Sequence, residues 1–463
     1  MGKNFGRTRV SGKNVVVLGL AKSGFAVSKL LSQLGARVTV NDQKAEHDEN
    51  AINELKELGV QVIVGGHPSG LIHQGIDLIV KNPGIPYTAE PVLEGTQLGI
   101  PIITEVELAY QITKAPIVGI TGSNGKTTTT TWVGEILQAA NRQPIVAGNI
   151  GTVFCEKANT ARPDEILVAE LSSFQLKGTK EFRPNVACLL NISSAHLDYH
   201  KTMEDYVLSK SKLFANMQKD DIAVLNADNE YCIKMVEVTQ AQIMWFSAKQ
   251  PVSIGAFVRD ADVVFLDQFG NEEKIIAVSE IGIPGAHNLE NALAATVISK
   301  SLGVDCAVIR QVLAGFKGVE HRLEFVEELN GIKYYNDSKA TNAQATMKAL
   351  ASFTDPIILI AGGLDRGVDF EELVPLLKEK VKGLVTYGQT KERFERIGKL
   401  AGLNLLDSVD NVRDAVVRAS QMASVGNIVL LSPACASWDM YSSFEERGSI
   451  FKESVHMLKT SPH

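Results

Sequence analysis

Residues 119–128, GITGSNGKTT, form the segment whose residue types most clearly suit phosphate chemistry. An apolar strand pattern precedes the segment, and an amphipathic helix pattern follows it from Lys126 to about Ala140. Glycines allow the backbone to wrap around a phosphate, and the first N–H groups of a helix have no partner within the helix. Lys126 would neutralise β- and γ-phosphate oxygens, and Thr127 or Thr128 would bind Mg²⁺. The remaining loop contacts are expected from Gly122, Ser123, Asn124 and Gly125.

The loop departs from the strict GxxxxGK[ST] pattern at one position. That pattern requires glycine at position 120, and this chain has Ile120 with Gly119 one residue earlier. A glycine-rich turn that binds no ligand is therefore the alternative interpretation. The strand before the loop and the helix after it favour phosphate binding.

Two further strands end in residues that could bind a metal ion. Glu170 follows the apolar run 166–169, and a carboxylate at the end of a neighbouring strand reaches the Mg²⁺ in many phosphate-loop enzymes. His196 and Asp198 follow the apolar run 186–190, so we expect them at the same edge of the sheet. The alternatives are a helix cap or a solvated acid at Glu170, and a structural histidine at His196.

Lys210 lies on the apolar stripe of a helix predicted over 203–217. A step of about 100° per residue places it on one face with four apolar residues, while Leu208 on the outer face makes the stripe imperfect. The four are Met203, Val207, Phe214 and Met217. A lysine in such a stripe must extend its amine to water, pair with an acid or lose its charge. A desolvated amine has a lowered pKa, and its neutral form can react with CO₂ to give a carbamate that could bind Mg²⁺.

A second glycine-containing turn lies near the start of the chain. The segment 19–24, GLAKSG, follows a strand pattern and begins a helix pattern, but Ala21 replaces the middle glycine of GxGxxG. Asp42 follows Gly19 by 23 residues, where an acid could meet a ribose hydroxyl. An NAD site, a helix-packing turn and a pocket for the pyrophosphate of another nucleotide all remain open.

The elements that would position these residues alternate between short apolar strands and amphipathic helices. This pattern begins near residue 14, restarts near 115 and restarts again after 318, and it predicts parallel sheets. The stretch 245–280 alternates β-branched and turn residues, which favours antiparallel or mixed pairing. We therefore predict three α/β domains at 1–104, 105–318 and 319–463: a Rossmann-like domain, a central P-loop domain and a second Rossmann-like domain. Ligand sites are expected at the carboxyl ends of the strands.

Composition excludes several classes of protein. Of 463 residues, 45% are hydrophobic and 21% are charged, which is ordinary for a globular chain. The net charge is 46 − 53 = −7, so no basic surplus indicates nucleic acid or anionic lipid as a partner. The five cysteines are widely spaced and read as reduced thiols. No apolar stretch approaches the roughly 20 residues of a membrane span, and no signal peptide is evident. A cytoplasmic location and no stable membrane association are therefore expected.

Together these motifs resemble the Mur ligase family of ATP-dependent enzymes that add amino acids to the peptidoglycan precursor. TGSNGKTT, AELSSFQL, SSAHLD, YVLSK, AHNLENALAA and EHRLE occur in family order, and the resemblance runs from about residue 14 to 452. The segments 336–342 (NDSKATN) and 431–448 (LSPACASWDMYSSFEERG) are similar to the D-glutamate-adding members. The resemblance implies that ATP phosphorylates the carboxylate of UDP-N-acetylmuramoyl-L-alanine, and that D-glutamate then attacks the acyl phosphate. It also implies small-molecule partners, two Mg²⁺ ions and a carbamylated lysine. A monomer is expected.

The resemblance also implies roles for individual residues. Lys126, Glu170, His196 and Lys210 would be catalytic, with Thr127 and Glu170 at one Mg²⁺ and His196 and carbamylated Lys210 at the other. Asn288 and Asn291 would contact adenine, Asp337 the ribose, and His321 and Arg322 the nucleotide or the transferred phosphoryl group. The UDP-substrate residues would be Leu20, Ala21, Asp42, Gln43, Asn82, Gly84 and, at the muramoyl part, Asn149. The D-glutamate residues would be Lys339, Thr341, Arg366, Ser437 and Phe444, with Arg366 standing where some relatives have lysine.

Three alternatives remain. Another amino-acid-adding Mur ligase would share the central motifs. A folylpolyglutamate synthetase shares the phosphate loop and the lysine, but that family lacks the leading α/β domain. An NAD(P)-linked oxidoreductase or a nucleotide-sensing regulator would account for the first domain and would leave TGSNGKTT, Glu170, His196 and Lys210 unexplained.

Overall fold

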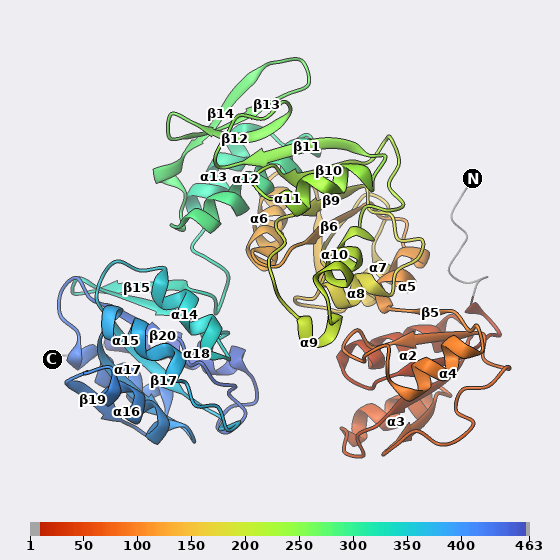
Figure 1. The fold of residues 1–463 in the computed structure, drawn as a ribbon, viewed down its shortest axis with the longest axis horizontal. Coiled ribbons are helices and arrows are strands. Elements are labelled where there is room, and N and C mark those ends of the chain that lie inside the picture. The colour runs from red at the N-terminus through yellow and green to blue at the C-terminus, as the bar shows by residue number, and fades with distance from the viewer. Residues whose placement is uncertain (1–9, 460–463) are drawn as a thin grey trace. The chain divides into compact units, whose positions relative to one another are not determined.

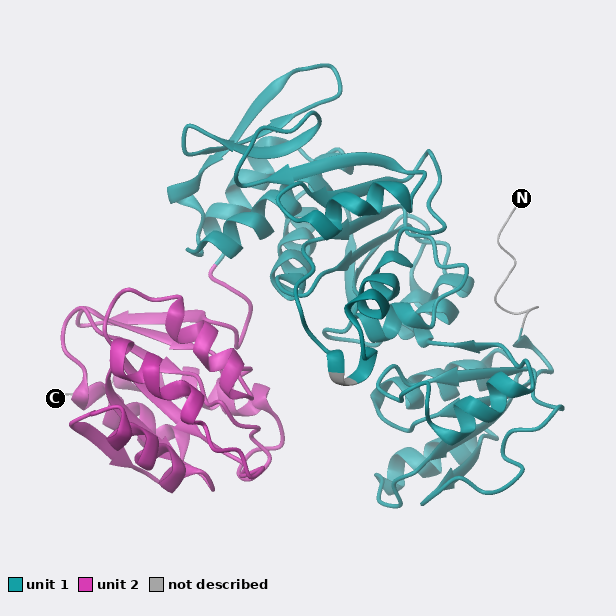
Figure 2. Cartoon of the chain, viewed as in Figure 1, with its two compact units in different colours: residues 1–316 teal, residues 317–463 magenta. Residues whose placement is uncertain are grey.

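The computed structural model describes residues 10–459, apart from the side chain of Asp198. The chain divides into two compact units, residues 1–316 and 317–463 (Figure 2). The first unit contains two sheets and the second contains one (Figure 1). Within the described residues, no helix combines the length and the apolar composition that crossing a membrane requires.

The first sheet has five parallel strands in the order β3-β2-β1-β4-β5. They are β1 (Asn14–Leu18), β2 (Arg37–Asp42), β3 (Gln61–Val64), β4 (Leu78–Lys81) and β5 (Ile102–Ile103), and they alternate with α2 (Lys22–Gln33), α3 (Glu49–Glu57) and α4 (Glu90–Gln97). Central strand β1 is apolar and buried from its second residue, Val15, to Leu18, because helices cover both faces of the sheet. The strand order reverses between β1 and β4, which is where open parallel sheets place ligands.

The second sheet has nine strands in the order β14-β13-β12-β11-β10-β9-β6-β8-β7. Its parallel part comprises β6 (Ile117–Thr121), β7 (Pro144–Gly148), β8 (Ile166–Glu170), β9 (Val186–Leu189), β10 (Ile222–Asn226), β11 (Gln242–Ser247) and β12 (Gly255–Arg259). Strands β13 (Asp262–Leu266) and β14 (Glu272–Ala277) add antiparallel pairs, which confirms the mixed pairing predicted for this stretch.

The helices of this region connect the strands of the second sheet. They are α5 (Glu105–Ile112), α6 (Lys126–Ala139), α7 (Phe154–Thr160), α8 (Ser173–Lys177), α9 (Leu197–His200), α10 (Met203–Ser211), α11 (Glu230–Ile233), α12 (Ala286–Ser301) and α13 (Cys306–Gly315). Helix α6 packs on α12, and its buried face includes Trp132, Val133, Ile136 and Leu137, which agrees with the amphipathic helix predicted there.

The third sheet has six strands in the order β15-β16-β20-β17-β18-β19. They are β15 (Glu324–Leu329), β16 (Ile332–Asn336), β17 (Ile357–Gly362), β18 (Val381–Tyr387), β19 (Leu405–Ser408) and β20 (Ile428–Leu431). Only the β15–β16 pair is antiparallel. The helices are α14 (Ala343–Ala351), α15 (Val374–Lys380), α16 (Lys391–Leu400), α17 (Val412–Met422) and α18 (Phe444–Leu458). The predicted α/β class is thus confirmed in all three sheets.

The predicted helix 203–217 is wrong at its carboxyl end. Helix α10 stops at Ser211, and the chain then tightens into turns in which Leu213 N–H donates to Lys210 O and Phe214 N–H to Ser211 O. These bonds span three residues instead of four, so Phe214 and Met217 do not continue the stripe. Both are buried nevertheless, because the turns return the chain to the core. Apolar periodicity therefore located the buried face correctly and misplaced the helix end.

Candidate active site

The phosphate-loop candidate connects the end of β6 to the start of α6. Gly125 has φ of 82°, and a Cβ at this position would lie 2.1 Å from Asn291 Oδ1, so glycine is required both by conformation and by space. Lys126 Nζ donates to the carbonyls of Gly122 (3.0 Å) and Ser123 (3.1 Å), so its ammonium lies over the loop. The residues 122–126 therefore have the strand–loop–helix arrangement that binds phosphate elsewhere.

The missing glycine at position 120 has a simple structural reason. Ile120 lies within β6, pairs in register with Glu170 and Cys188, and is fully buried. Gly119 faces Leu213, whose Cδ1 would lie 2.8 Å from an added Cβ. The glycine one residue earlier thus serves packing, while the loop itself begins at Gly122.

Asn191 and Tyr206 hold the loop in place, and sequence reasoning did not identify either of them. Asn191 accepts from Ser123 N–H through its carbonyl (2.9 Å) and from Asn124 N–H through its side-chain oxygen (2.9 Å). The Tyr206 hydroxyl lies 2.9 Å from Ser123 Oγ. The signal for Asn191 was its place just after β9, next to β6 in the sheet. Tyr206 gave no comparable signal.

Glu170 ends β8 beside the loop and is almost completely buried. Its Oε2 accepts from Thr127 Oγ1 and its Oε1 from Asn149 Nδ2, both at 2.8 Å. Adjacent parallel strands end at the same edge of a sheet, which explains how residues 43 positions apart meet. Burial excludes a solvated acid, and Ser172 is the residue that caps α8, so neither alternative for Glu170 holds.

Lys210 lies beneath the phosphate loop. Its side chain is 1% exposed, and Nζ donates to Gly122 O (2.9 Å) and Thr121 Oγ1 (3.2 Å). Burial lowers the pKa of Lys210 well below its ordinary value, nearby Lys126 lowers it further, and Glu170 opposes both effects. An amine extended to water is therefore excluded for this lysine.

His196 differs from the other predicted metal-binding residues. Its side chain is exposed, its φ is 57°, and its ring packs edge-on against Phe174 at 5.0 Å between centroids. Across residues 10–459, no group of three or more His, Cys, Asp or Glu side chains is arranged as a metal site. The structure therefore brings Thr127, Glu170 and Lys210 to the phosphate loop and leaves His196 beside Phe174.

Asn288 and Asn291 lie on one face of α12 next to the loop. Asn291 is buried against Gly125, and its Nδ2 lies 3.5 Å from Asn288 Oδ1. Asn288 Nδ2 donates to Pro284 O at 2.7 Å. A surface position is thus excluded for Asn291, which borders the loop at Gly125, and Asn288 contacts Asn291 and Pro284.

Four of the predicted UDP-substrate residues meet at the carboxyl ends of β1, β2 and β4. Leu20 N–H donates to Asp42 Oδ2 (2.7 Å), and Asn82 accepts from Gly84 N–H (3.2 Å) while donating to Ser23 Oγ (3.1 Å). Ala21 precedes α2 and Gln43 is exposed beside Asp42. Asn149 lies apart from this group, because it follows β7 and contacts Glu170.

In the second unit, three predicted residues lie around the ends of β16 and β20. Asp337 is buried and accepts from Ser432 Oγ (2.8 Å) and Leu323 N–H (3.3 Å). Burial raises the pKa of Asp337 to about 7, against the lowering effect of these hydrogen bonds and of Arg322. Lys339 Nζ lies 5.1 Å from the centroid of the Phe444 ring.

The other predicted residues of this unit differ in how far they are exposed to solvent. Ser437 is buried, Thr341 is half-buried and Arg366 is exposed, with its guanidinium 5.2 Å from the centroid of the Trp438 ring. Arg322 is exposed. His321, by contrast, is buried inside the unit, with Nδ1 2.9 Å from Asn336 Nδ2, and its approach to the nucleotide or the phosphoryl group stays a prediction.

Arg447 is the main residue of this unit that sequence reasoning missed. It is fully buried and donates from Nε to Ser338 Oγ (2.9 Å), from Nη2 to Ser338 O (2.7 Å) and from Nη1 to Cys435 O (3.1 Å). Arg447 thereby joins the loop that carries Lys339 to the loop that carries Ser437. In the sequence it is one of several charges in FEERG and resembles a surface residue.

Comparisons with known proteins agree with this arrangement. Three family descriptions match consecutive parts of the chain: the Mur ligase MurD-like N-terminal domain at 13–104, the Mur ligase middle domain at 120–299, and the Mur ligase glutamate ligase domain at 321–435. The chain belongs to the Mur ligase family. The family resemblance and the three-domain α/β fold predicted from the motifs are both confirmed. Because the match includes residues 13–104, the first domain lends no support to an oxidoreductase.

Relatives of this Mur ligase are similar over nearly the whole chain. A UDP-N-acetylmuramoylalanine–D-glutamate ligase of Geobacillus sp. (strain WCH70) is 50% identical over 448 residues, which cover 96% of this chain and 98% of the relative. The ligase of the same name from Bacillus mycoides (strain KBAB4) is 49% identical over 451 residues, covering 97% and 99%.

Solved structures show the same fold at lower identity. The UDP-N-acetylmuramate–alanine ligase MurC of Thermotoga maritima is 18% identical, with a TM-score of 0.57 and coverage of 97% of this chain and 100% of that one. The MurF ligase of the same organism, solved in complex with ADP, is 18% identical, with a TM-score of 0.54 and coverage of 98% and 97%.

Proposed function

We propose that this Mur ligase joins D-glutamate to UDP-N-acetylmuramoyl-L-alanine and converts ATP to ADP and phosphate. The observation that carries the proposal is the 50% identity over 96% of the chain to a ligase of that name. The contacts among Thr127, Glu170 and the phosphate loop support the use of ATP, as does the ADP complex of a MurF ligase of the same fold.

The proposed chemistry begins with an unreactive carboxylate. ATP transfers its γ-phosphoryl group to the carboxylate of the UDP-substrate, and ADP leaves. The amino group of D-glutamate attacks the acyl carbon and gives up a proton, and the tetrahedral intermediate releases phosphate as the amide forms. Lys126 and the N–H groups of 122–128 would neutralise phosphate charge, so the protein contributes alignment and electrostatic stabilisation.

Two magnesium sites are part of the proposal. The Thr127 hydroxyl and the Glu170 carboxylate are hard oxygen donors, which suit Mg²⁺, and they lie 2.8 Å apart. When bound, Mg²⁺ would withdraw negative charge from the phosphoryl oxygens. His196 and Lys210 would hold the second ion, with Lys210 as a carbamate: its neutral amine attacks CO₂ and releases one proton. The burial of that amine supports this modification.

The three predicted domains would divide the substrates between them. Residues 1–104 would bind the UDP part through Leu20, Ala21, Asp42, Gln43, Asn82 and Gly84, and Asn149 would reach the muramoyl part. Residues 105–318 would bind ATP, with Asn288 and Asn291 at adenine. Residues 319–463 would contribute Arg322, Asp337 and the D-glutamate set, Lys339, Thr341, Arg366, Ser437 and Phe444. We propose a monomer that works in the cytoplasm, where ATP and nucleotide sugars are available.

A phosphate-release assay tests the proposal. Release should require ATP, Mg²⁺, the UDP-substrate and D-glutamate together, and mass spectrometry should find one product with the mass of the D-glutamyl amide. L-lysine, meso-diaminopimelate and L-alanine serve as competing amines, and absorbance at 340 nm with NADH serves as the control for a dinucleotide-linked reaction. Release with another amine in place of D-glutamate, or none with all four components, would refute the assignment.

A further inference from the structure

Helix α9 follows His196 directly and cannot hold its own position. It has only four residues, Leu197–His200, and it lies between two non-glycine residues with positive φ, His196 (57°) and Lys201 (65°). A single helical turn has too few internal hydrogen bonds to be stable by itself. Side-chain contacts with neighbouring elements must therefore fix this helix, and with it the backbone of His196.

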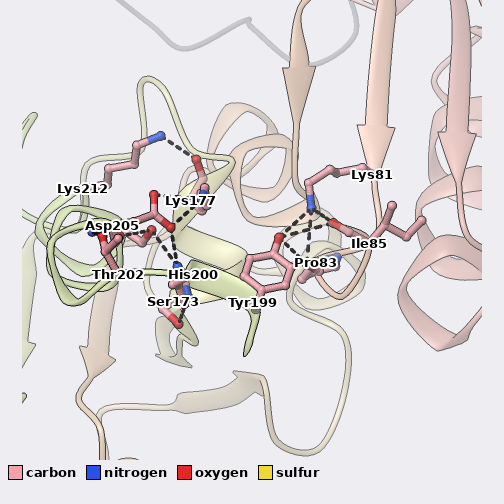
Figure 3. A network of polar contacts seen from close by, with 11 residues as sticks. Lys81, Pro83, Ile85, Ser173, Lys177, Tyr199, His200, Thr202, Asp205 and Lys212 are labelled. Atoms are coloured by element: carbon pink, nitrogen blue, oxygen red, sulfur yellow. Dashed lines mark hydrogen bonds and ion pairs between the residues drawn. The ribbon is translucent and has the colours of Figure 1, made fainter. Parts of the chain in front are cut away.

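Tyr199 fastens α9 to the loop that follows β4. Its hydroxyl lies 3.1 Å from Pro83 O and 3.3 Å from Ile85 O, and it accepts from Lys81 Nζ at 3.3 Å (Figure 3). Lys81 Nζ also donates to Ile85 O at 2.8 Å. The loop 82–85 includes Asn82 and Gly84, which we assign to the UDP-substrate. One hydroxyl thus connects that loop to the turn after His196.

Lys81 makes the contact between Tyr199 and the 82–85 loop polar, and burying its amine there costs desolvation energy. Its side chain is 1% exposed, and the oxygens around its ammonium belong to the carbonyls of residues 82, 83 and 85 and to the Tyr199 phenol. Apolar side chains would pack such a buried position at less desolvation cost. Directional hydrogen bonds fix the relative position of two segments in a way that apolar contacts do not.

The opposite side of α9 is fixed by His200. Its Nδ1 lies 2.8 Å from Asp205 Oδ2 on α10, and its Nε2 lies 2.9 Å from Ser173 Oγ on α8 (Figure 3). Asp205 also pairs with Lys177 at 2.6 Å. Helix α8 begins three residues after Glu170, and α10 carries Lys210. The helix is therefore tied to α10, which carries Lys210, and to α8, which follows Glu170 in the chain.

Phe174 completes the connection to His196. Its ring packs edge-on against His196 at 5.0 Å and against Tyr199 at 4.5 Å between centroids. A displacement of Tyr199 would therefore be passed to His196 both through the backbone of α9 and through this ring.

We infer that Tyr199 is a positioning residue that couples the 82–85 loop to His196, so that binding of the UDP-substrate aligns His196 for phosphoryl transfer. This inference rests on the proposed function. It assigns to Tyr199 no contact with any substrate. Tyr199 acts on the alignment of the UDP-substrate with the phosphate site. Loss of its hydroxyl should therefore leave the binding of ATP and of D-glutamate unchanged.

Tyr199→Phe tests the coupling, because it removes the hydroxyl and keeps the ring that packs on Phe174. The loss of a neutral hydrogen bond in this position should raise KM for the UDP-substrate and lower kcat, together by about 3- to 10-fold in kcat/KM. KM for ATP and for D-glutamate should stay within about twofold of the wild type. Tyr334→Phe is the matched control, since it removes a buried phenol that bonds Ser420 Oγ at 2.9 Å in the second unit, and neither residue is assigned to a substrate.

Hydrogen–deuterium exchange provides a second test that needs no substitution. In the wild-type enzyme, binding of the UDP-substrate without ATP should protect the backbone amides of residues 196–201 as well as those of 82–85. Lys81→Met combined with Tyr199→Phe should lower kcat/KM by less than the product of the two single effects, because the two side chains contact each other and hold the same loop.

The outcomes separate the coupling from the proposed reaction. No ligation by the wild-type enzyme would overturn both. An active wild-type enzyme with unchanged kinetics in Tyr199→Phe, equal changes in KM for all three substrates, or no protection of 196–201 would overturn the coupling alone. A change confined to the UDP-substrate, with Tyr334→Phe unaffected, is the result expected.

Discussion

Asp337 should make the second unit less stable at neutral pH than it is in acid, and Asp337→Asn should remove this loss of stability. The carboxyl group is buried, and its partners are the Ser432 hydroxyl and the Leu323 N–H. An asparagine keeps one oxygen for Leu323, and its amide can donate to Ser432 Oγ, whose single proton can then be donated to Thr346 Oγ1 at 3.0 Å. The substitution therefore removes a charge without leaving a partner unsatisfied.

The size of the effect follows from the pKa of Asp337. Burial raises this pKa from 3.8 to about 7, so the folded state binds the proton more tightly than the unfolded state does. The stability that this proton contributes is fully present below about pH 4 and is lost as the pH rises through 7. Three pKa units correspond to about 4 kcal/mol. Relative to the wild type, Asp337→Asn should gain little at pH 4 and about 4 kcal/mol at pH 8.

Urea unfolding between pH 4 and pH 8, followed by hydrogen exchange in β16 and β20, would measure this gain in the second unit. Asp355→Asn is the matched control, because Asp355 is partly exposed and pairs with Lys333 at 3.5 Å, so its effect should stay below about 1 kcal/mol at every pH. If Asp337 contacts the ribose as proposed, the stabilised variant should bind ATP about tenfold more weakly. A stability difference that does not change with pH, or a variant that is less stable at pH 8, would refute the reasoning.

Three other substitutions test separate parts of the site. Lys210→Ala should reduce ligation at least about 100-fold while circular dichroism and thermal stability show an intact fold, with partial rescue by short-chain carboxylic acids; full activity would remove the carbamate from the mechanism. Gly125→Ala should abolish ADP binding measured by calorimetry, because its Cβ would lie 2.1 Å from Asn291 Oδ1, and unchanged affinity would contradict this. Arg447→Met should destabilise the second unit by about 2–5 kcal/mol in urea and raise KM for D-glutamate, since it leaves the carbonyls of Ser338 and Cys435 without a donor. Unchanged stability would show that water replaces the guanidinium.

The parts of the site that lie at strand ends could be predicted from the sequence. Lys126, Thr127 and Glu170 each follow a short apolar run, and parallel strands bring their carboxyl ends to one edge. Thr127 and Glu170 do lie together at that edge, with 2.8 Å between Thr127 Oγ1 and Glu170 Oε2. The position of these residues could be predicted because the strand pattern, the loop composition and the residue types all indicated a phosphate site at the carboxyl edge of the sheet.

Contacts that depend on how distant segments pack could not be predicted. Asn191 and Tyr206 support the phosphate loop through a carbonyl, an amide and a hydroxyl, and such groups occur throughout the chain without marking a site. The end of α10 at Ser211 depends on turn hydrogen bonds that no apolar repeat encodes. The assignments of residues to the UDP-substrate and to D-glutamate stay predictions, because they concern contacts that form when these substrates bind.

Two buried lysines show where sequence periodicity stops being informative. Lys210 was recognisable because it occupies an apolar face of a helix, where a charge interrupts a repeat of about 3.6 residues. Lys81 is buried to the same degree, yet it ends the four-residue strand LIVK, which is too short to have a repeat that a charge could interrupt. At the end of a strand a lysine normally begins a solvated turn, so its type and position carry no sign of burial. Its role follows from the carbonyls of residues 82, 83 and 85 and from the phenol of Tyr199, which lies 118 residues further along the chain. A residue such as Lys81, which connects two segments, is therefore harder to identify from sequence than a residue that contacts substrate. Its role depends on the groups packed around it, and its own residue type and position do not indicate that role.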